Sequence, residues 1–374
     1  MAVFGINMGT KNSYLSVLEK GSHTPRLIKK FPSEVVVTDQ VDKNDIDPRD
    51  CFSGFIRLLG REFDDPIVQR EMNKGKNGDA WVETSYGKQC SPSELLQMLA
   101  LKIKAAAETY LGKISVSNSV FVFTFPSRVL VALEFEMIIM GVRCGFNDVK
   151  LVHEFSAAAA IYGLHKRRGL SAIVDFGART LDITFWISPL DDVFGAYTIK
   201  GLPQRGMYLG GDDFDDVILK YIVSEFKIKE GIDLVEDRRL REAAEKAKIA
   251  LSTSIETKIK LPNVITDPSG DSRDLKIKLT REKFETLAGN LTEKIRQLCV
   301  KSLNKASISA KDLKDVLLVG GMANVPMVKR VIEEVFGKAP KRGVDKEAAV
   351  ACGAVMVVAE ASSCLGINPA CMDT

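Results

Sequence analysis

Two short turns in this 374-residue chain carry residues that are able to bind phosphate and a metal ion. Gly9-Thr10 follows the apolar segment 3–7, and the turn from Gly177 to Thr180 follows the apolar segment 173–176. Glycine turns at strand ends expose backbone N–H groups that bind phosphate oxygens, and threonine adds a hydroxyl donor. Asp175, just before the second turn, is placed to hold a hydrated Mg²⁺, and Asp182, just after it, to orient a water molecule. Each turn taken alone is more typical of an ordinary β-hairpin than of a ligand site.

Two further groups of residues have spacings that suit a ligand. Gly320-Gly321 lets a backbone approach a flat ring or a ribose, although a strand-to-helix turn with positive φ needs glycine there as well. Glu245, Lys248 and Ser252 share one face of a predicted helix, which is either a ligand-facing or a solvated charged face. The sequence contains no Walker A, H-E-x-x-H or G-x-S-x-G pattern, and its three histidines lack the spacing of metal ligands.

The elements that must position these residues alternate between strand and helix patterns, which predicts an α/β architecture. Helical spacing of apolar residues covers 93–110, 129–140, 237–251 and 326–336, and strand patterns cover 3–7, 13–18, 120–125, 173–176, 181–187 and 316–319. Segments 258–262 and 275–279 predict a hairpin with its turn at 267–270. Because each Gly-Thr turn joins two strands, the two turns together predict a duplicated α/β domain with one such hairpin in each half.

Composition excludes several classes of protein. The chain has 52 basic and 49 acidic residues, a net charge of +3, so no basic excess points to nucleic acid or to a membrane surface as a partner. No apolar run has the length of a membrane span. The seven cysteines are odd in number and form no C-x-x-C pair, which indicates reduced thiols rather than a disulfide framework or a zinc site.

In their order along the chain, these motifs resemble the nucleotide-binding domain of the seventy-kilodalton heat-shock chaperones, the DnaK family. The resemblance covers nearly the whole chain, and its segments NGDAWVE and REAAEKAK are most similar to the bacterial and mitochondrial branch. The segments that carry it are GINMGTKNSYLSV (5–17), GREFDDPIVQ (60–69), NGDAWVE (77–83), HEFSAAAAIYGL (153–164), DFGARTLDI (175–183), LGGDDFDD (209–216), REAAEKAKIALSTS (241–254), VLLVGGMANVP (316–326), FGKAP (336–340) and AAVACGA (348–354).

The resemblance implies the actin-like ATPase fold, in which two duplicated ribonuclease-H-like lobes surround a nucleotide cleft. We therefore expect lobe I at residues 1–165 and lobe II at 166–358, with an inserted helical and β subdomain at about 205–290. Residues 359–374 are expected to be a tail without the family's apolar linker, and the chain has no segment that matches the peptide-binding domain.

The family binds Mg-ATP and hydrolyses it, so the resemblance also implies a site. Asp175, Asp182, Glu154 and Thr180 are the implied catalytic residues, with Asp175 holding the metal through water. Lys11 and Arg179 add cations to the two turns and, by our hypothesis, partly replace Mg²⁺; alternatively Arg179 fills the phosphate site and no nucleotide binds. The implied nucleotide contacts are Gly9, Thr10, Lys11, Gly177, Arg179, Gly210, Glu245, Lys248, Ser252, Gly320 and Gly321.

The departures from the family pattern fall on the chemistry. The metal-facing aspartate of the family is Asn7 here, and an amide lacks the charge that holds a hard cation. The family's catalytic lysine is Ile56, which cannot stabilise charge on a phosphoryl group, and two glycines of the second turn are Ala178 and Arg179. Loss of one catalytic group typically lowers the rate by about 10²–10³, so we expect weak or absent hydrolysis and doubt that Mg²⁺ binds.

The sequence thus predicts a chaperone-family domain, related to protein folding, that binds ATP or ADP and is an ATP hydrolase only if its altered site is active. The alternative is a non-catalytic pseudo-ATPase that acts as an interaction or scaffold subunit. The implied partners are a J-domain protein or a nucleotide exchange factor, without nucleic acid, membrane or a peptide clamp in this chain. The resemblance points to mitochondria, but no transit peptide precedes Val3, so a cytoplasmic location stays open.

Overall fold

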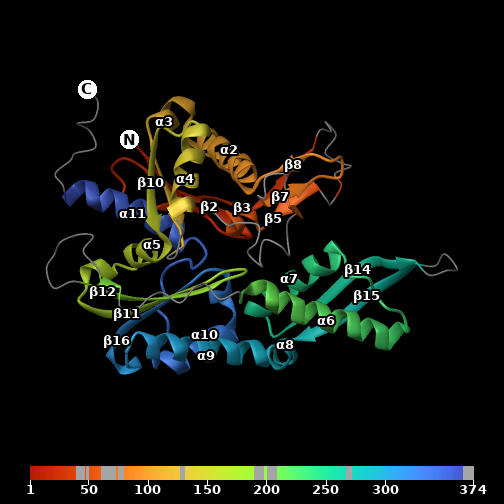
Figure 1. Ribbon diagram of the computed structural model, residues 1–374. Coiled ribbons are helices and arrows are strands. Elements are labelled where there is room, and N and C mark those ends of the chain that lie inside the picture. Colours follow the sequence, from red (N-terminus) through yellow and green to blue (C-terminus); the bar gives the residue numbers. More distant parts are fainter. Residues whose placement is uncertain are drawn as a thin grey trace. The chain divides into compact units, whose positions relative to one another are not determined.

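The computed structural model describes residues 1–38, 47, 50–59, 73–74, 80–126, 131–188, 198–199, 209–266 and 272–364 (Figure 1). The chain divides into two compact units. Unit 1 comprises Met1–Arg168, Ser188–Thr198 and Ala348–Thr374, and unit 2 comprises Gly169–Ile187 and Ile199–Glu347. Segment 60–69, which carries part of the resemblance, the expected turn at 267–270, residues 127–130 and the last ten residues of the expected tail lie outside the described residues.

Unit 1 is built on a five-stranded sheet in the order β10-β9-β1-β2-β3. β1 pairs in parallel with β9 and antiparallel with β2, and β9 pairs in parallel with β10. Because parallel strands end at the same edge of a sheet, the carboxyl ends of β1, β9 and β10 lie together. The bounds are β1 Val3–Met8, β2 Asn12–Leu18, β3 Arg26–Pro32, β9 Val120–Phe125 and β10 Asp148–His153.

Helices cover both faces of this sheet. Phe4 and Phe121 point to one face, where they share a core with apolar residues of α2 (Pro92–Leu111) and α4 (Val131–Arg143). Gly5 follows Phe4 on β1 and therefore faces the other side, where α11 (Ala349–Cys364) contacts β1 and packs on α5 (Glu154–Ile161). The smaller elements of unit 1 are β4 Glu34–Val36, β5 Cys51–Ser53, η2 Phe55–Leu58, β6 Asn73–Lys74, β7 Ala80–Glu83, β8 Gln89–Cys90, α3 Lys113–Ser117 and η3 Leu164–Lys166.

Unit 2 repeats the central arrangement of unit 1. Its four-stranded sheet has the order β13-β12-β11-β16, with β11 parallel to β16. The hairpin β11–β12 therefore has the parallel strand β16 beside its first strand. The hairpin β1–β2 has the parallel strand β9 in the same position, which confirms the predicted duplication. The bounds are β11 Gly169–Phe176, β12 Leu181–Ser188, β13 Thr198–Ile199 and β16 Leu313–Val319.

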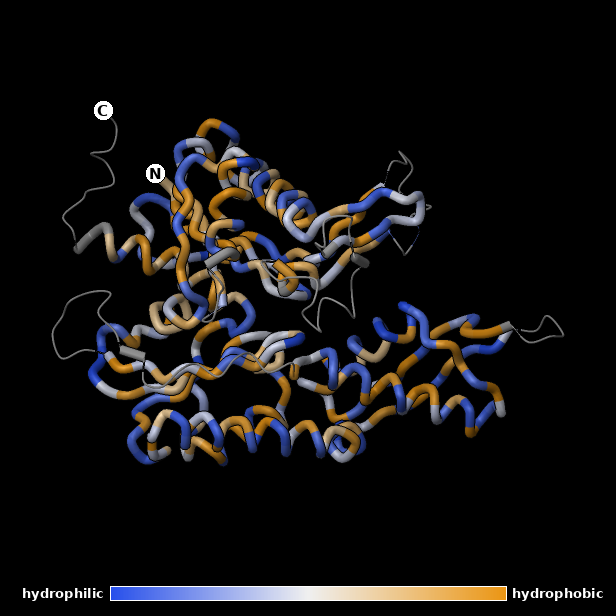
Figure 2. Tube along the Cα trace, viewed as in Figure 1, coloured by the Kyte–Doolittle hydropathy of each residue, from blue (hydrophilic) through white to orange (hydrophobic). Residues whose placement is uncertain are grey.

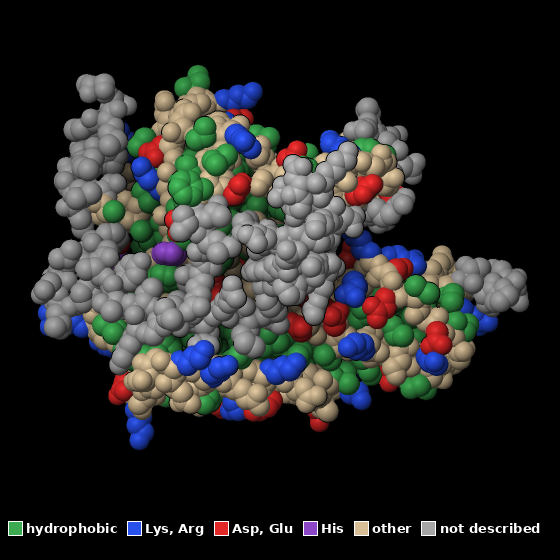
Figure 3. All heavy atoms as spheres, viewed as in Figure 1, with side chains coloured by type: hydrophobic (Ala, Val, Ile, Leu, Met, Phe, Trp, Pro, Cys, Tyr) green, Lys and Arg blue, Asp and Glu red, His purple; other side chains and the backbone are tan. Residues whose placement is uncertain are grey.

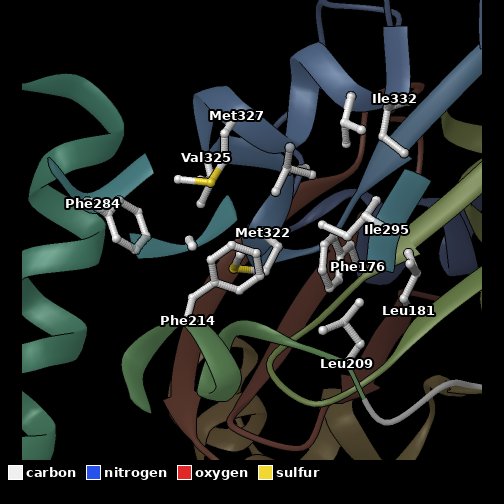
Figure 4. Packing of buried hydrophobic residues seen from close by; sticks show 14 of the residues in the cluster. Phe176, Leu181, Leu209, Phe214, Phe284, Ile295, Met322, Val325, Met327 and Ile332 are labelled. Atoms are coloured by element: carbon white, nitrogen blue, oxygen red, sulfur yellow. The ribbon is translucent and has the colours of Figure 1, made fainter. Parts of the chain in front are cut away.

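The helices of unit 2 bury one apolar cluster against this sheet. Figure 4 shows Phe176 and Leu181 of the hairpin, Phe214, Met322 and Ile332 facing a common core. Helix α9 alternates hydrophobic and hydrophilic residues in Figure 2, as expected for a helix with one buried face. The remaining elements are α6 Gly211–Glu230, α7 Arg238–Thr253, β14 Glu256–Thr266, β15 Ser272–Thr280, α8 Arg281–Leu287, α9 Gly289–Lys305, η4 Ala310–Asp312, η5 Gly321–Asn324 and α10 Pro326–Phe336.

The elements predicted from apolar spacing are confirmed with small shifts at their ends. Segments 93–110, 237–251 and 326–336 form α2, α7 and α10, the described part of 129–140 lies in α4, and the predicted hairpin is β14–β15. Cys51, Cys90, Cys144, Cys299 and Cys352 are free thiols, as predicted. Among the described residues, no helix combines the length and apolar character that a membrane span needs.

Candidate functional site

In unit 1, the predicted site residues lie at the carboxyl ends of the parallel strands. The turn Gly9-Thr10-Lys11 joins β1 to β2, with Met8 paired to Ser13 across its base. Gly9 and Thr10 thus stand at the end of β1, and Glu154 begins α5 directly after β10. The backbone carbonyl of Lys11 accepts a hydrogen bond from the amide of Ser33 at 2.8 Å, which ties the turn to the end of β3.

Asn7 links these strand ends through its amide group. Its Nδ2 donates to Thr124 Oγ1 at 2.9 Å and to Glu154 Oε1 at 3.0 Å, and the side chain is buried. An ionised carboxylate only accepts hydrogen bonds, so an aspartate at position 7 could not make the contact with Glu154 without a shared proton or a cation. The substitution that removes the family's aspartate therefore also supplies a neutral partner for Glu154.

Ile56 occupies an apolar environment. It lies in η2 and is half-buried against the hydrophobic core of unit 1. Of its neighbours in sequence, Phe55 belongs to the same core and Phe52 packs against it. The position at which the family has a catalytic lysine is thus used for packing in this chain. Removal of a branched aliphatic side chain from water stabilises the folded state.

In unit 2, the second turn docks on the beginning of α6. The amide of Gly177 donates to the carbonyl of Thr180 at 3.0 Å, which closes the turn between β11 and β12. The amides of Gly211 and Asp212 donate to the carbonyls of Gly177 and Ala178 at 3.1 and 2.8 Å. Two N–H groups that a helix start normally leaves unsatisfied are therefore taken up by this turn.

Gly210 is required for this docking. A Cβ atom at position 210 would lie 2.2 Å from the carbonyl oxygen of Ala178 and 2.3 Å from Cα of Arg179, distances that no side chain tolerates. The amide of Gly210 donates to Asp213 Oδ2 at 2.8 Å, so Asp213 caps the helix start from within α6. The glycine predicted to frame a nucleotide thus has a structural reason of its own.

Arg179 of this turn forms a short ion pair with the beginning of α6. Its Nε lies 2.6 Å from Oδ2 of Asp212, and both side chains are about one-third exposed or less, at 26% and 34%. The carboxylate neutralises much of the charge that Arg179 would offer to an anion, so a phosphate group at this turn has to compete with Asp212.

Asp175 and Asp182 form a pair of carboxyl groups on neighbouring strands. Burial raises the pKa of Asp175 to about 6. Burial and the charge of Asp175 raise the pKa of Asp182 to about 7, although a hydrogen bond with Thr180 acts in the opposite direction. In the part of the chain that the structure describes, no group of three or more acidic, histidine or cysteine side chains is arranged to hold a metal ion.

On α7, the three residues predicted to share a face do so, and the centre of that face is buried. Lys248 Nζ lies 2.8 Å from Asp215 Oδ1 and donates to the carbonyl of Gly211 at 2.9 Å. Glu245 and Ser252 are half-buried beside it, and Ser252 Oγ donates to the carbonyl of Lys248 at 3.3 Å. A solvated charged face is therefore wrong for Lys248, whose ammonium is held between α6 and α7.

Gly320-Gly321 forms the turn that follows β16, as predicted. Gly320 has a φ of 87°, the left-handed region that favours glycine, and a Cβ atom there would lie 2.9 Å from Asp175 Oδ1. The parallel strands β11 and β16 thus bring Asp175 and Gly320 together at one edge of the sheet. The amide of Gly320 donates to the carbonyl of Lys346 at 2.9 Å.

Lys346 stands among other cations beside this turn. Its Nζ donates to the carbonyl of Ala323 at 3.1 Å. Burial, together with the charges of Lys329 and Arg342, lowers its pKa to about 8. No sequence pattern singled out Lys346, because its burial and the nearby charge of Lys329 on α10 depend on the fold.

The lowered pKa of Lys346 predicts how stability changes with pH. Between pH 8 and 10.5 the unfolded chain keeps a proton on this amine that the folded chain has lost, so the free energy of unfolding rises with pH across this window. We expect urea denaturation to show a smaller rise in Lys346→Met than in the unchanged chain. Equal pH dependence in the two proteins would show that Lys346 titrates normally.

The structure also shows partners that sequence reasoning missed. Thr124, Asp212 and Asp215 hold Asn7, Arg179 and Lys248, respectively. Asp212 and Asp215 lie within the segment LGGDDFDD, so an acidic run directly after a glycine pair was the available signal. Thr124 had none, because it is one polar residue inside an apolar strand.

A duplicated unit with a β-hairpin, a parallel third strand and a glycine turn at each strand end defines the actin-like ATPase fold, and the chain has this fold. The sequence profile described as "Hsp70 protein" matches residues 3–363, and the chain belongs to this family.

Among its relatives are proteins named "Heat shock 70 kDa protein, mitochondrial". The one from Solanum tuberosum is 39% identical and the one from Pisum sativum 40% identical, in both cases over 95% of this chain and 54% of the relative. "Heat shock protein hsp-6" of Caenorhabditis elegans is 36% identical over 95% of this chain and 56% of its own length. The chain thus spans about half the length of these relatives.

Proposed function

We propose that this chain binds ATP or ADP as the nucleotide-binding domain of a chaperone-family protein and hydrolyses ATP weakly or not at all. The observation that carries the proposal is the hydrogen bond from Asn7 to Glu154, because a neutral amide takes the place of one of two neighbouring acidic groups. The packing of Ile56 in the core supports the proposal, since this position supplies no cation for a phosphoryl group. Asp175, Asp182, Thr180 and Glu154 stay the proposed catalytic residues of any remaining activity.

The residues of each unit fit Mg²⁺ poorly. A hard cation prefers ionised oxygen ligands, whereas Asn7 directs an N–H group at Glu154, and the pKa of about 7 leaves Asp182 partly protonated near neutral pH. Our proposal therefore includes no step that depends on the metal. Asp175 is the side chain that would hold the metal through water if it binds.

The proposed nucleotide contacts differ in what each can contribute. The backbone amides of the turns at Gly9-Thr10 and Gly177 are proposed for the phosphates, and Gly210, Glu245, Lys248, Ser252, Gly320 and Gly321 for the adenosine. Arg179 contributes a cation only if phosphate displaces Asp212 from its guanidinium. Lys248 is expected to contribute mainly through the position of α7, because its ammonium already contacts Asp215.

Isothermal titration calorimetry with ATP and with ADP tests binding and its dependence on metal. We expect heat of binding in both Mg²⁺ and EDTA, with affinities that differ by less than about tenfold, because Asn7 stands where an ionised ligand would favour the metal. Asp212→Asn is expected to strengthen binding, since it removes the carboxylate that competes for Arg179. Absence of heat in both buffers would contradict nucleotide binding and favour the alternative, a pseudo-ATPase that acts as an interaction or scaffold subunit.

The domain organisation, partners and location are proposals as well. We propose lobe I at 1–165, lobe II at 166–358 with an inserted subdomain at about 205–290, and a C-terminal tail at 359–374. A J-domain protein or a nucleotide exchange factor is the proposed partner, with no role for nucleic acid or membrane. Because two relatives are named mitochondrial, we propose mitochondria as the location, with the cytoplasm as the alternative.

A further inference from the structure

Helix α4 of unit 1 carries a continuous apolar stripe on its outer face. Its residues have the spacing i, i+3, i+4 and i+7, which places them along one side of the helix, opposite the residues that enter the core. Phe135 and Val142, at the two ends of the stripe, are 61% and 70% exposed, and the two residues between them are at least 40% exposed. We call the residues Phe135, Ile138, Ile139 and Val142 the α4 stripe.

Helix α2 widens this apolar surface. Hydrogen bonds from Ser93 Oγ to Glu136 (2.8 Å) and from Lys104 Nζ to the carbonyl of Gly145 (2.7 Å) show that α2 and α4 run side by side in the same direction. Met98 and Leu101 of α2 are exposed on the layer that these helices form. Figure 3 shows hydrophobic side chains gathered over this part of the molecule.

This surface differs from an ordinary protein surface because several of its exposed apolar residues are neighbours. Single exposed apolar residues are common, but contiguous patches of roughly 300–600 Å² on a protein surface mark interaction sites. The α4 stripe with Met98 and Leu101 supplies six large apolar side chains on two neighbouring helices. A stable interface buries roughly 800 Å² on each partner, so this surface suits the apolar centre of such an interface, surrounded by polar residues.

Two charged residues beside the stripe identify the partner. Glu136 and Arg143 are seven residues apart, and this spacing places them on the same flank of α4, two turns from each other. Arg143 is exposed and makes no ion pair with another described residue. Glu136 accepts the hydrogen bond of Ser93 through Oε2, which leaves its charge available on this flank.

We propose that a second copy of this chain covers the stripe, with the two α4 helices antiparallel about a twofold axis near Ile138 and Ile139. This axis places Phe135 of each copy opposite Val142 of the other, because the two residues lie at equal distances from the centre. It also brings Glu136 of each copy beside Arg143 of the other, with an offset of about 3 Å along the helix, a distance that the long arginine side chain spans. One surface thus provides both members of each ion pair.

The charges decide between the possible arrangements of the helices. In a parallel contact with twofold symmetry, the flank with Glu136 and Arg143 would lie on opposite sides of the two helices, so neither ion pair would form. In the antiparallel contact, both ion pairs form at the rim of the apolar centre, where they select orientation more than they add affinity.

Sedimentation velocity of the 374-residue chain tests the proposal. We expect a monomer–dimer equilibrium with a dissociation constant on the order of micromolar, the usual strength of an interface of this size without large hot spots. Ile139→Glu is expected to give a monomer, because it buries a charge at the centre of the contact. Ile228→Glu, on α6, alters an equally apolar residue that is 78% exposed and is expected to leave the dimer intact. A monomeric unchanged chain, or a dimer that Ile139→Glu does not weaken, would overturn the proposal.

Charge reversal tests the antiparallel arrangement itself. Glu136→Arg and Arg143→Glu should each weaken the dimer by about tenfold, since each places like charges together. The double variant Glu136→Arg/Arg143→Glu restores both ion pairs and is expected to recover the affinity. Circular dichroism melting curves identify any variant that fails to fold. Loss of affinity that the double variant does not restore would exclude the antiparallel contact.

Discussion

Lys248→Met is expected to destabilise the protein by about 3–5 kcal/mol, a large part of the stability of an ordinary domain. The side chains of Lys248 and Asp215 are each only 9% exposed, and their charged atoms lie 2.8 Å apart. Methionine fills a similar volume but leaves the carboxylate of Asp215 buried without its cation. It also removes the hydrogen bond to the carbonyl of Gly211. Equilibrium urea denaturation measures the loss.

The same helix offers a matched control. Lys246 is 79% exposed and lies 3.9 Å from Glu242, so Lys246→Met is expected to change stability by less than about 1 kcal/mol. In the double variant Lys248→Met/Asp215→Leu, both charges are gone and apolar groups replace them, so most of the lost stability should return. Equal effects of Lys246→Met and Lys248→Met, or a double variant less stable than Lys248→Met, would contradict the role of this buried pair.

This ion pair also shows what the sequence could and could not predict. The spacing of Glu245, Lys248 and Ser252 correctly placed them on one face of a helix, because helical periodicity is a local property. Whether that face is buried depends on α6, whose Asp215 is thirty-three residues away, and no local pattern reports such a contact. The strands and helices were predictable because they follow from local periodicity. The partner of Lys248 was not, because the contact joins two distant segments.

The site in unit 1 follows the same division. The sequence showed that Asn7 replaces an aspartate, and this comparison needs no three-dimensional information. It did not show that Asn7 donates to Glu154 and Thr124, because these contacts join residues more than one hundred positions apart. Likewise the sequence showed that Ile56 stands where the family has a lysine. That Ile56 packs against the core becomes visible only when the sheet and α2 are assembled.

Asn7→Asp is expected to make the stability of the protein dependent on Mg²⁺. The new carboxylate would lie about 3 Å from Glu154, where the amide now donates, and two ionised groups at that distance repel. The melting temperature should therefore fall in EDTA and recover in Mg²⁺, because a divalent cation neutralises both groups. Asn7→Ala loses the same hydrogen bonds without adding charge, so it should melt at the same temperature in both buffers. A melting temperature of Asn7→Asp that ignores Mg²⁺ would contradict this account.

With Ile56→Lys added, we expect ATP hydrolysis to rise by about 10² or more over the unchanged chain. One group that stabilises charge in a transition state is typically worth about 10²–10³ in rate, and the double variant supplies an ionised ligand and a cation together. Ile56 is half-buried, so a lysine can bury its aliphatic stem and extend its ammonium toward solvent without opening the core.

Single-turnover phosphate release in Mg²⁺ measures the gain. Ile56→Met keeps the apolar packing without charge and serves as the control, with no expected gain beside Asn7→Asp. Fast hydrolysis by the unchanged chain would show that Asn7 and Ile56 do not limit the reaction. A double variant that gains Mg²⁺-dependent stability but no hydrolysis would place the lost activity elsewhere, and the turn in which Ala178 and Arg179 replace two glycines is then the next position to restore. The stability and rate measurements together therefore separate loss of the metal from loss of the catalytic cation.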